Sequence, residues 1–362
     1  MTSLLPLIEA EKDLEIAAVA DPDITGMTAK FEKRGYSPTL YGDAESMLGS
    51  ETLDGVMIGT RCSLHTPMAL LAAKKNVPIF LEKPVSVSHE QLEELKTLLP
   101  MSDRIVVSFP LRLTSIVARV KELLNEDTIG RIEHIQAWNN VYYGRGYYKK
   151  WYRDDHETGG LFLQKSTHDF DYILSLLEGE KPIRICAAES KRVFTGNMPA
   201  GQKCADCPKA AECPESPENL RKAGEPENGE FCAFAVDTGN QDSGSAILEF
   251  ESGLHAVYSQ DFIVRKKAGR RGARLIGYKG TLEFDFKTSE IKLFHHFEDK
   301  VETIKVTDTG NHSGGDSKLI ENFANVVRGR SKSEATLAEG IESARLCLAA
   351  RDSAVNHRFI EL

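Results

Sequence analysis

Residues 158–176 carry the side chains best suited to acid–base chemistry. Histidine is the side chain best suited to take a proton near neutral pH, so the imidazole of His168 could take the proton of a hydroxyl group. Two glycines open the segment and an apolar-faced helix follows, so Gln164 and His168, at positions i and i+4, are predicted to share a face. A histidine in a helix is often structural, and the segment alone leaves that alternative open.

A second candidate is Lys83, which lies between Glu82 and Pro84 directly after the apolar run 78–81. Pro84 biases the preceding residue towards an extended backbone, so the lysine is predicted to be held rigidly. Ligands of open parallel sheets bind beyond the carboxyl ends of the strands, which would place Thr60, His65 and Lys83 along one crevice. A solvated lysine before a loop proline is the alternative that the tripeptide alone leaves open.

The elements that must position Lys83 read as a doubly wound parallel sheet. Short apolar strands alternate with helical patterns through the first part of the chain, as in right-handed βαβ units. Asp21 closes the first apolar run. The predicted strands are 14–20, 55–60, 78–83 and 104–109, and the predicted helices are about 25–34, 66–75 and 89–99.

After residue 107 the pattern changes to an α+β domain, predicted to span 108–362. Alternating strands separated by hairpin turns predict an open, largely antiparallel sheet, with helices on one face and the other free for a homodimer or homotetramer contact. The predicted strands are 131–140, 245–250, 255–262, 274–278, 281–286, 290–296 and 300–306. The predicted helices are 115–125, 169–179, 317–328 and 337–357.

Composition excludes several classes of protein. The 362 residues are 41% hydrophobic and 27% charged, as in a globular protein, and this length favours two domains. The net charge of −9 argues against nucleic acid or an anionic membrane as the main partner. No apolar run reaches the ~18 residues of a transmembrane helix, and no secretory signal opens the chain, so a cytoplasmic protein is predicted.

Four of the seven cysteines cluster in a Pro-, Gly- and Glu-rich surface excursion, predicted at 195–232. In a reducing compartment such a cluster suggests a metal before disulfides, and a structural zinc is favoured over an iron–sulfur cluster. Free thiols, or disulfides in a protein outside the cytosol, are the alternatives. The cluster consists of Cys204, Cys207, Cys213 and Cys232.

Taken in order, these motifs resemble the Gfo/Idh/MocA oxidoreductases over almost the whole chain. The resemblance rests on the acid after the strand 14–20, the Thr60–His65 loop, Glu82-Lys83-Pro84, "SFPLR" at 108–112 and the glycines and His168 of the second domain. It implies an N-terminal Rossmann domain that binds NAD or NADP. It also implies a C-terminal substrate and oligomerisation domain, and a sugar, inositol or polyol substrate that reacts at a secondary alcohol or ketone.

The resemblance also assigns roles within the cofactor and catalytic groups. Lys83 would contact the reacting hydroxyl near the nicotinamide and stabilise a developing alkoxide. Asp21 would bind the adenosine ribose and favour NAD, whereas Arg61 leaves NADP open. Thr60, His65 and Glu82 would belong to the cofactor site, and His168 would be the general base.

Further residues are expected at the substrate. Arg112 matches a position that commonly reaches the active site, and a surface ion pair is its alternative. His312 lies in a family-like stretch, 311–316, in which Asp316 could cap the following helix. Trp151, in the aromatic segment 139–155, suits stacking against a sugar ring, or else a lid or an oligomer contact.

The chain departs from the family at Gln164, where many members carry an aspartate. An amide cannot stabilise an imidazolium as a carboxylate would, although it can hydrogen-bond substrate. Lys165, which follows, could bind substrate or point into solvent. Two alternatives therefore stay open: an NAD-dependent enzyme that cleaves a glycosidic bond without net redox change, and a catalytically inactive sugar-binding or regulatory paralogue.

The start of the chain is atypical for this fold. A helix at residues 4–11 precedes the strand 14–20, but no strand and glycine-rich turn precede that helix. Because the turn seats the pyrophosphate of the cofactor, we expect the given sequence to lack roughly ten to fifteen residues at its start.

Overall fold

The chain folds into two compact units in the computed structural model. Unit 1 comprises Met1–Leu113 and Gly310–Glu342, and unit 2 comprises Thr114–Thr309 and Ser343–Leu362. The chain therefore leaves unit 1 and returns to it near its C-terminus. The residues that the structure describes are 4–227, 229–307 and 311–362.

Short parallel strands form the framework of unit 1. β1 pairs with β2 in one sheet, and β4 lies between β3 and β5 in another. Because β4 and β5 are apolar and buried on both faces, they pair as parallel strands between covering layers. The predicted doubly wound parallel sheet is confirmed. The strands are β1 (Ala18–Ala20), β2 (Thr39–Tyr41), β3 (Val56–Ile58), β4 (Ile79–Leu81) and β5 (Ile105–Val107).

Capping side chains start the connecting helices of unit 1. Asp23, Asp43 and Ser88 each accept a hydrogen bond from a backbone N–H in the first turn of the helix that follows. The helices are α1 (Leu5–Ala10), α2 (Ile24–Glu32), α3 (Ala44–Ser50), α4 (His65–Ala73) and α5 (His89–Leu95). Three 3₁₀ segments join them: η1 (Cys62–Leu64), η2 (Lys96–Arg104) and η3 (Pro110–Leu113).

Two late segments complete unit 1. They are α11 (Gly315–Val327), preceded by η7 (Asn311–Gly314), and the first turns of α12 (Leu337–Asn356). The ring of Phe323 packs edge-on against Phe80 of β4, with centroids 5.8 Å apart. At Gly340 an added Cβ would lie 2.9 Å from the Val85 side chain, so glycine allows α12 to approach the sheet closely.

No ladder joins β1 to β3 within the residues that the structure describes, so the parallel strands form two separate sheets. The missing strand and glycine turn expected from the sequence would lie ahead of Leu4. That expectation falls outside the described residues, and it stays a prediction.

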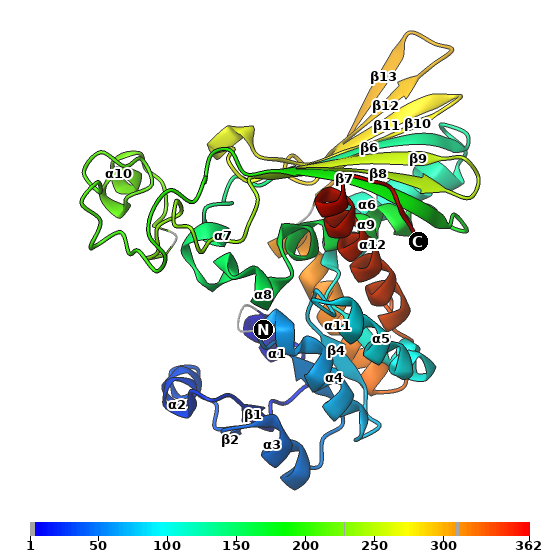
Figure 1. The fold of residues 1–362 in the computed structure, drawn as a ribbon. Coiled ribbons are helices and arrows are strands. Elements are labelled where there is room, and N and C mark those ends of the chain that lie inside the picture. Colours follow the sequence, from blue (N-terminus) through cyan, green and yellow to red (C-terminus); the bar gives the residue numbers. More distant parts are fainter. Residues whose placement is uncertain (1–3, 228, 308–310) are drawn as a thin grey trace. The chain divides into compact units, whose positions relative to one another are not determined.

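Unit 2 is built on one nine-stranded sheet, which Figure 1 shows from its edge. Its order is β13-β12-β11-β10-β6-β9-β8-β7-β14. Among the described strands of this sheet, β6 and β9 are the one parallel pair. The predicted largely antiparallel sheet is confirmed. The strands are β6 (Ile132–Asn140), β7 (Pro182–Ser190), β8 (Ser243–Phe250), β9 (His255–Asp261), β10 (Arg270–Gly277), β11 (Gly280–Asp285), β12 (Glu290–His295), β13 (Lys300–Lys305) and β14 (Ile360–Glu361).

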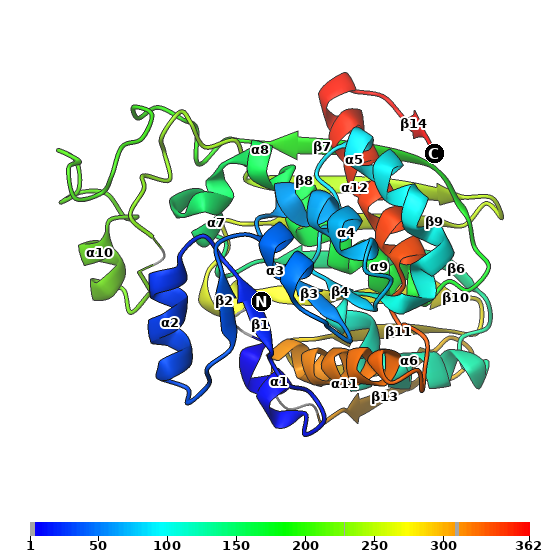
Figure 2. The same ribbon diagram turned by 90° about the horizontal axis from the view of Figure 1, so that it is seen from below.

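Helices cover one face of this sheet (Figures 1 and 2). They are α6 (Ser115–Asn125), α9 (Thr167–Ser175) and the unit 2 part of α12. Burial alternates along β8, as expected for strands with one covered face. The expected homo-oligomer contact through the sheet stays a prediction.

The predicted helix that carries His168 has an irregular start. A π-helical turn, η5 (Phe162–Ser166), precedes α9, so Gln164 and His168 do not share a regular α-helical face. The expectation that the two side chains face the same way stays a prediction. Wider turns of this kind are rare and occur often at functional sites.

An extension of unit 2 packs on the aromatic segment that follows β6. Phe194 and Ala233 join Val141, Tyr148 and Phe262 in a small buried core of its own. Helices α7 and α10 lie at the same end of the sheet (Figures 1 and 2). The short helices of this region and of the loop before β10 are α7 (Gly146–Lys149), η4 (Trp151–Arg153), α8 (Asp155–Thr158), α10 (Pro217–Lys222) and η6 (Lys266–Ala268).

Candidate active site

A histidine ties together the loops that follow β3 and β4. The ring of His65 is 1% exposed, and its Nδ1 lies 2.7 Å from the carbonyl oxygen of Pro84 and its Nε2 3.3 Å from that of Thr60. Burial lowers the pKa of His65, so the ring is neutral and has a single N–H to donate. The shorter distance favours donation from Nδ1 to Pro84.

Two further side chains hold the same loops, and the sequence did not single them out. The Thr66 hydroxyl donates to the Val85 carbonyl at 2.9 Å. The Gln91 amide donates to the Ser63 carbonyl at 2.7 Å and accepts from the Val87 N–H at 2.9 Å. The signal in the sequence that could have identified Thr66 and Gln91 was a polar residue on an otherwise apolar helix face. The backbone that follows Lys83 is therefore held by side chains from α4 and α5.

Lys83 lies just beyond the carboxyl end of β4, as predicted. Its side chain is half-buried, and its peptide bond to Pro84 is cis. The N–H of Glu82 donates to the Ile58 carbonyl at 3.0 Å, which carries the ladder one residue past β4. Thr60 is exposed after β3. Unit 1 thus brings Thr60, His65, Glu82 and Lys83 to one edge of the sheet.

Asp21 lies at the end of β1, where the sequence placed it. Its backbone N–H donates to the Tyr41 carbonyl at 3.0 Å, and its Oδ1 accepts from the Asp23 N–H at 2.8 Å. The carboxylate is therefore oriented by the chain that turns into α2. Because β1 belongs to the other parallel sheet, Asp21 is separated by a sheet boundary from the group around Lys83.

Arg112, which is buried, forms an ion pair with the partly exposed Glu339 inside unit 1. Its guanidinium donates to the Glu339 carboxylate at 2.5 Å and to the Glu334 carbonyl at 3.1 Å. Burial opposes ionisation of Glu339, but Arg112 and hydrogen bonds from Thr336 together hold the pKa of Glu339 below its usual range. This pair links the end of β5 to the start of α12, and the expected substrate role of Arg112 stays a prediction.

His312 lies in a strained turn before α11. His312 and Ser313 both have left-handed backbone angles, with φ of 43° and 52°. The Nδ1 of His312 lies 2.9 Å from a carboxylate oxygen of Asp316. The expectation that Asp316 caps the helix is wrong: α11 begins at Gly315, and Asp316 lies within its first turn.

In unit 2 the structure buries Gln164, Lys165 and His168. The Gln164 amide faces the Thr158 carbonyl at 3.5 Å, at the limit of a hydrogen bond. Lys165 points to Tyr143, with 2.6 Å between Nζ and the phenolic oxygen. The alternative in which Lys165 points into solvent is excluded by its 6% exposure.

The buried carboxylate of Asp169 binds side chains from three strands next to this cluster. One of its oxygens accepts from Arg271 Nε at 2.7 Å, and the other accepts from Asn139 at 2.8 Å and from the Tyr258 hydroxyl at 2.9 Å. These partners come from β10, β6 and β9. No signal in the sequence pointed to them beyond charged and polar residues in strands, because strand register cannot be read from one sequence.

The aromatic segment holds Trp151 in a stack. Its ring lies 3.9 Å from that of Tyr152 at an interplanar angle of 26°. Behind this segment, the buried carboxylate of Glu215 pairs with Arg145 at 4.0 Å and with Arg265. Lys149, also buried, donates to the Glu215 carbonyl at 2.6 Å. The extension therefore supports the aromatic segment through buried charges as well as through packing.

The cysteines do not form a metal centre in the structure. Among the described residues, no group of three or more His, Cys, Asp or Glu side chains is placed to hold a metal ion. The predicted structural zinc is therefore not supported, and neither is the iron–sulfur alternative. Cys207, Cys213 and Cys232 instead line a cavity of about 260 Å³. Burial raises the pKa of Cys204 and of Cys232, which favours neutral thiols.

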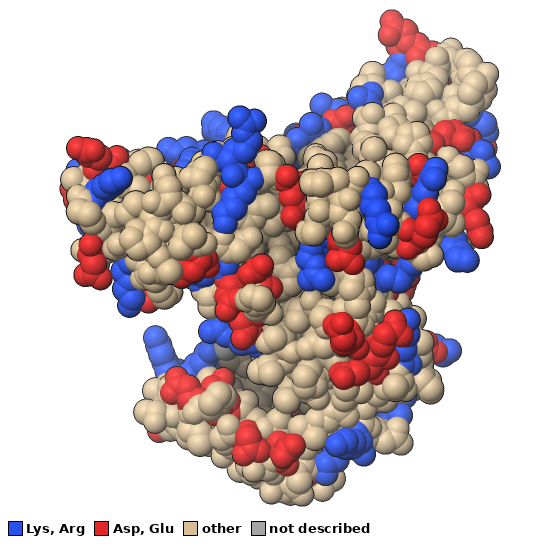
Figure 3. All heavy atoms as spheres, in the orientation of Figure 1, with Lys and Arg blue, Asp and Glu red and all other residues tan. Residues whose placement is uncertain are grey.

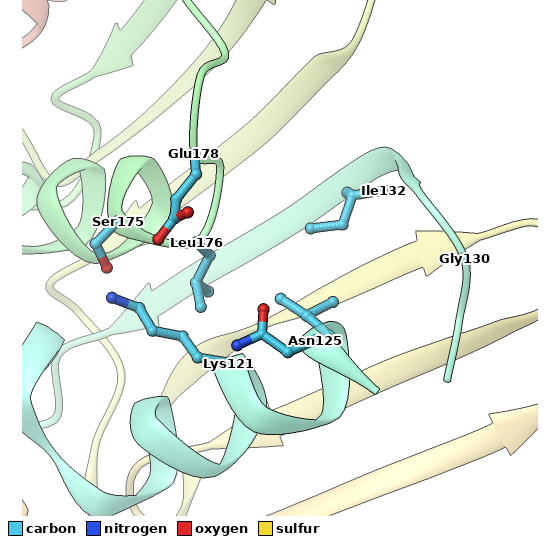
Figure 4. A pocket seen from close by; sticks show the side chains of 8 residues that line it. Lys121, Asn125, Gly130, Ile132, Ser175, Leu176 and Glu178 are labelled. Carbon is cyan, nitrogen blue, oxygen red and sulfur yellow. The ribbon is translucent and has the colours of Figure 1, made fainter. Parts of the chain in front are cut away.

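Another cavity of about 260 Å³ lies between α6 and the end of α9, where the Lys121 ammonium points towards Ser175 (Figure 4). None of the predicted catalytic or substrate residues lines it. Acidic and basic side chains are intermixed on the face shown in Figure 3. Within the described residues, no helix has the length and hydropathy to cross a membrane.

Comparison with known proteins agrees with the fold. A sequence profile of the Gfo/Idh/MocA oxidoreductases, described as an NAD-binding Rossmann fold, matches residues 2–109. The profile of the Gfo/Idh/MocA C-terminal domain matches residues 117–283. YteT of Bacillus subtilis strain 168, which is assigned as an oxidoreductase, is 25% identical over 364 residues, covering 88% of this chain and 84% of YteT.

Solved structures share the fold over nearly the full chain. Myo-inositol 2-dehydrogenase from Lactobacillus plantarum superimposes with a TM-score of 0.72 at 16% identity, covering 98% of this chain and 94% of that one. Levoglucosan dehydrogenase, in complex with NADH and levoglucosan, gives a TM-score of 0.74 at 17% identity, covering 99% and 94%. At these identities the two structures show a shared fold alone.

The fold and the matched profiles define an oxidoreductase with an NAD-binding Rossmann domain. The chain belongs to the Gfo/Idh/MocA family, so the resemblance drawn from its motifs is confirmed.

Proposed function

We propose that the protein transfers a hydride between a nicotinamide cofactor and a secondary alcohol or ketone of a sugar, polyol or glycoside. The observation that carries this proposal is Lys83, fixed beyond the carboxyl end of β4 by the contact of His65 with Pro84. Neighbours in fold include proteins named as dehydrogenases of inositol and levoglucosan, which supports the substrate class.

The residues of unit 1 fit a dinucleotide. Asp21 presents a carboxylate at the end of a parallel strand, where it would accept hydrogen bonds from ribose hydroxyls and favour NAD. Arg61, exposed after β3, leaves NADP open. Thr60, His65 and Glu82 would line the remainder of the site at the edge of the second parallel sheet. A bound nicotinamide would supply the acceptor for the hydride that leaves the substrate carbon.

The catalytic and substrate residues would have separate roles at the substrate. Lys83 would stabilise the negative charge that develops on the reacting oxygen, and His168 would take the hydroxyl proton. Trp151 would stack against the sugar ring. Gln164, Arg112 and His312 are the further substrate candidates. We also propose a homodimer or homotetramer formed through the open face of the unit 2 sheet.

A screen of sugars, polyols and glycosides with NAD and NADP tests the function, with reduced cofactor followed by absorbance. We expect turnover with at least one sugar-like alcohol and its loss in Lys83→Ala. Lys75→Ala, an exposed lysine at the end of α4, is the matched control and should retain activity. A Lys83→Ala variant that keeps wild-type turnover would refute the role of Lys83.

Two other outcomes distinguish the alternatives. Cleavage of a glycoside without accumulation of NADH would identify a glycoside-cleaving enzyme. Folded protein that binds neither NAD nor NADP by calorimetry would identify a sugar-binding or regulatory protein.

A further inference from the structure

Tyr143 and Lys165 contact each other, and Tyr143 is exposed whereas Lys165 is buried. The Tyr143 side chain is 41% exposed in the turn after β6, whereas Lys165, in η5, is 6% exposed. Their polar atoms lie 2.6 Å apart. Nζ also lies 4.5 Å from the ring centroid of Tyr143 and 5.2 Å from that of Tyr147, within the range of a cation–π contact.

The surroundings of Lys165 do not neutralise an ammonium group. The carboxylate that acts on Lys165 is that of Asp169, whose oxygens already accept from Arg271, Asn139 and Tyr258. Arg271 balances the charge of Asp169, so a protonated Lys165 adds an uncompensated positive charge to a buried cluster. Such a charge is costly in a medium of low polarity.

Burial, together with the nearby charge of Arg271, therefore lowers the pKa of Lys165 to about 7, with Asp169 acting in the opposite direction. The other titratable side chains on the same helical segment are His168, Asp169, Asp171 and Tyr172, and Arg271, Tyr143 and Tyr147 act on Lys165 from neighbouring segments. A lysine that changes charge near neutral pH can exchange a proton under working conditions, which an ordinary lysine cannot.

The turn that carries Tyr143 is fixed by close backbone packing. At Gly144 an added Cβ would lie 2.4 Å from the Phe262 carbonyl oxygen, so only glycine allows this approach. The Val141 N–H donates to the Asp261 carbonyl at 2.7 Å on the other side of the turn. The phenol is thus placed by the end of β9 rather than by a mobile loop.

We infer that Tyr143 and Lys165 act as an acid–base pair, in which the exposed phenol exchanges a proton with a substrate hydroxyl and the buried amine stores it. The inference rests on the proposed function and assigns the hydroxyl proton to Tyr143 in place of His168. During oxidation the substrate O–H bond breaks and its proton passes to the Tyr143 oxygen, while the phenolic proton passes to the lone pair of Nζ. The hydride leaves the same carbon for the nicotinamide, which gives a ketone, reduced cofactor and a protonated Lys165.

The first experiment measures the protonation of Lys165 directly and does not depend on enzymatic turnover. Full-length protein labelled with ¹³C at lysine Cε is titrated by NMR, and the Lys165 signal is assigned by its loss in Lys165→Arg. We expect that signal to titrate near neutral pH and to shift its midpoint in Tyr143→Phe, which removes the hydroxyl but keeps the ring. A Lys165 signal that titrates like the exposed lysines would overturn the inference, whatever the activity.

The second arm uses the pH dependence of kcat/KM with an accepted substrate. An arginine cannot lose its proton, although it keeps the positive charge and stacks on aromatic rings. Lys165→Arg should therefore lower kcat about 100-fold or more and remove the ionisation near neutral pH, and Tyr143→Phe should lower kcat as well. Lys181→Arg and Tyr278→Phe, both exposed in unit 2, are the matched controls.

The outcomes separate the inference from the proposed function. Wild-type kinetics in Lys165→Arg, with an unchanged pH profile, would show that Lys165 serves charge and packing alone and would overturn the inference. Absence of hydride transfer in the wild type would count against the proposed function, and the NMR titration would still decide whether Lys165 exchanges its proton near neutral pH.

Discussion

The Nδ1 atom of His65 lies 2.7 Å from the carbonyl oxygen of Pro84, and this contact holds the residue next to Lys83 against the start of α4. The histidine is the first residue of α4, which follows the loop after β3, and the proline belongs to the loop after β4. One buried ring therefore sets the spacing between two loops that are consecutive along the sheet edge. We therefore expect His65 to position Lys83.

Replacing His65 by alanine should loosen both loops. The variant loses a buried hydrogen bond and leaves a cavity, so we expect a loss of about 2–4 kcal/mol of unfolding free energy in urea denaturation. With an accepted substrate, kcat should fall at saturating cofactor because Lys83 is no longer held. His89→Ala, at an exposed position on α5, is the control. Unchanged stability and kcat in His65→Ala would show that the contact is dispensable.

The buried His65 also predicts a pH dependence of stability. Its folded pKa lies below the unfolded value of about 6.5, so between these two values the unfolded chain binds more protons. The contribution of His65 is therefore complete above about pH 6.5 and is lost as the pH falls towards the lowered folded value. Thermal unfolding of wild type and His65→Ala between pH 7.5 and pH 5 should show a steeper acid decline in the wild type. Parallel curves would contradict this prediction.

Variants of the ion pair between Arg112 and Glu339 distinguish a structural role of Arg112 from a role in binding substrate. Glu339→Gln removes the charge that balances a buried guanidinium, and because Glu339 is partly exposed we expect a loss of about 1–2 kcal/mol of unfolding free energy. If Arg112 serves structure alone, KM for substrate should stay constant in this variant and in Arg112→Lys at a temperature where both are folded. A rise in KM in Arg112→Lys without loss of stability would instead support the expected substrate contact.

Glu215 should be required for the order of the extension. Glu215→Gln leaves the buried Arg145 with less compensating charge and removes the partner of Arg265, so we expect a loss of about 2–4 kcal/mol. Limited proteolysis should then cut within residues 195–232 at lower protease concentration. The matched control is Glu218→Gln in the same extension, where the pair with Lys222 is exposed and should contribute little. Equal protease sensitivity of the two variants would contradict this role of Glu215.

Local patterns in the sequence predicted most of the fold. The apolar runs that became β3, β4 and β5 were recognised because buried parallel strands are almost continuously hydrophobic. Alternation and turn residues likewise predicted β8 to β13. β2 and β7 were not predicted: β2 has three residues, and β7 mixes charged and small residues without strict alternation.

The missed parts of the site depend on distant residues. Asp169 meets Arg271, which lies 102 residues further along the chain, and such a pairing follows from sheet register rather than from either local sequence. The π-helical turn at Phe162–Ser166 has the hydrophobic pattern of an ordinary helix, and Lys165 contacts Tyr143 and Tyr147, which lie about 20 residues earlier in the chain. Lys83 could be placed because strand polarity alone determines which edge of a parallel sheet it reaches.

Unit 1 is built from two separate segments of the chain, and this has a consequence for its folding during biosynthesis. Its second segment, Gly310–Glu342, follows nearly all of unit 2 in the chain. During translation the strands that lead to Lys83 leave the ribosome early, but α11 and the Gly340 turn that pack on them appear only near the end. Vectorial folding can therefore finish the unit 2 sheet first, and the N-terminal unit stays incomplete, and in need of protection from aggregation, until the last stage of synthesis.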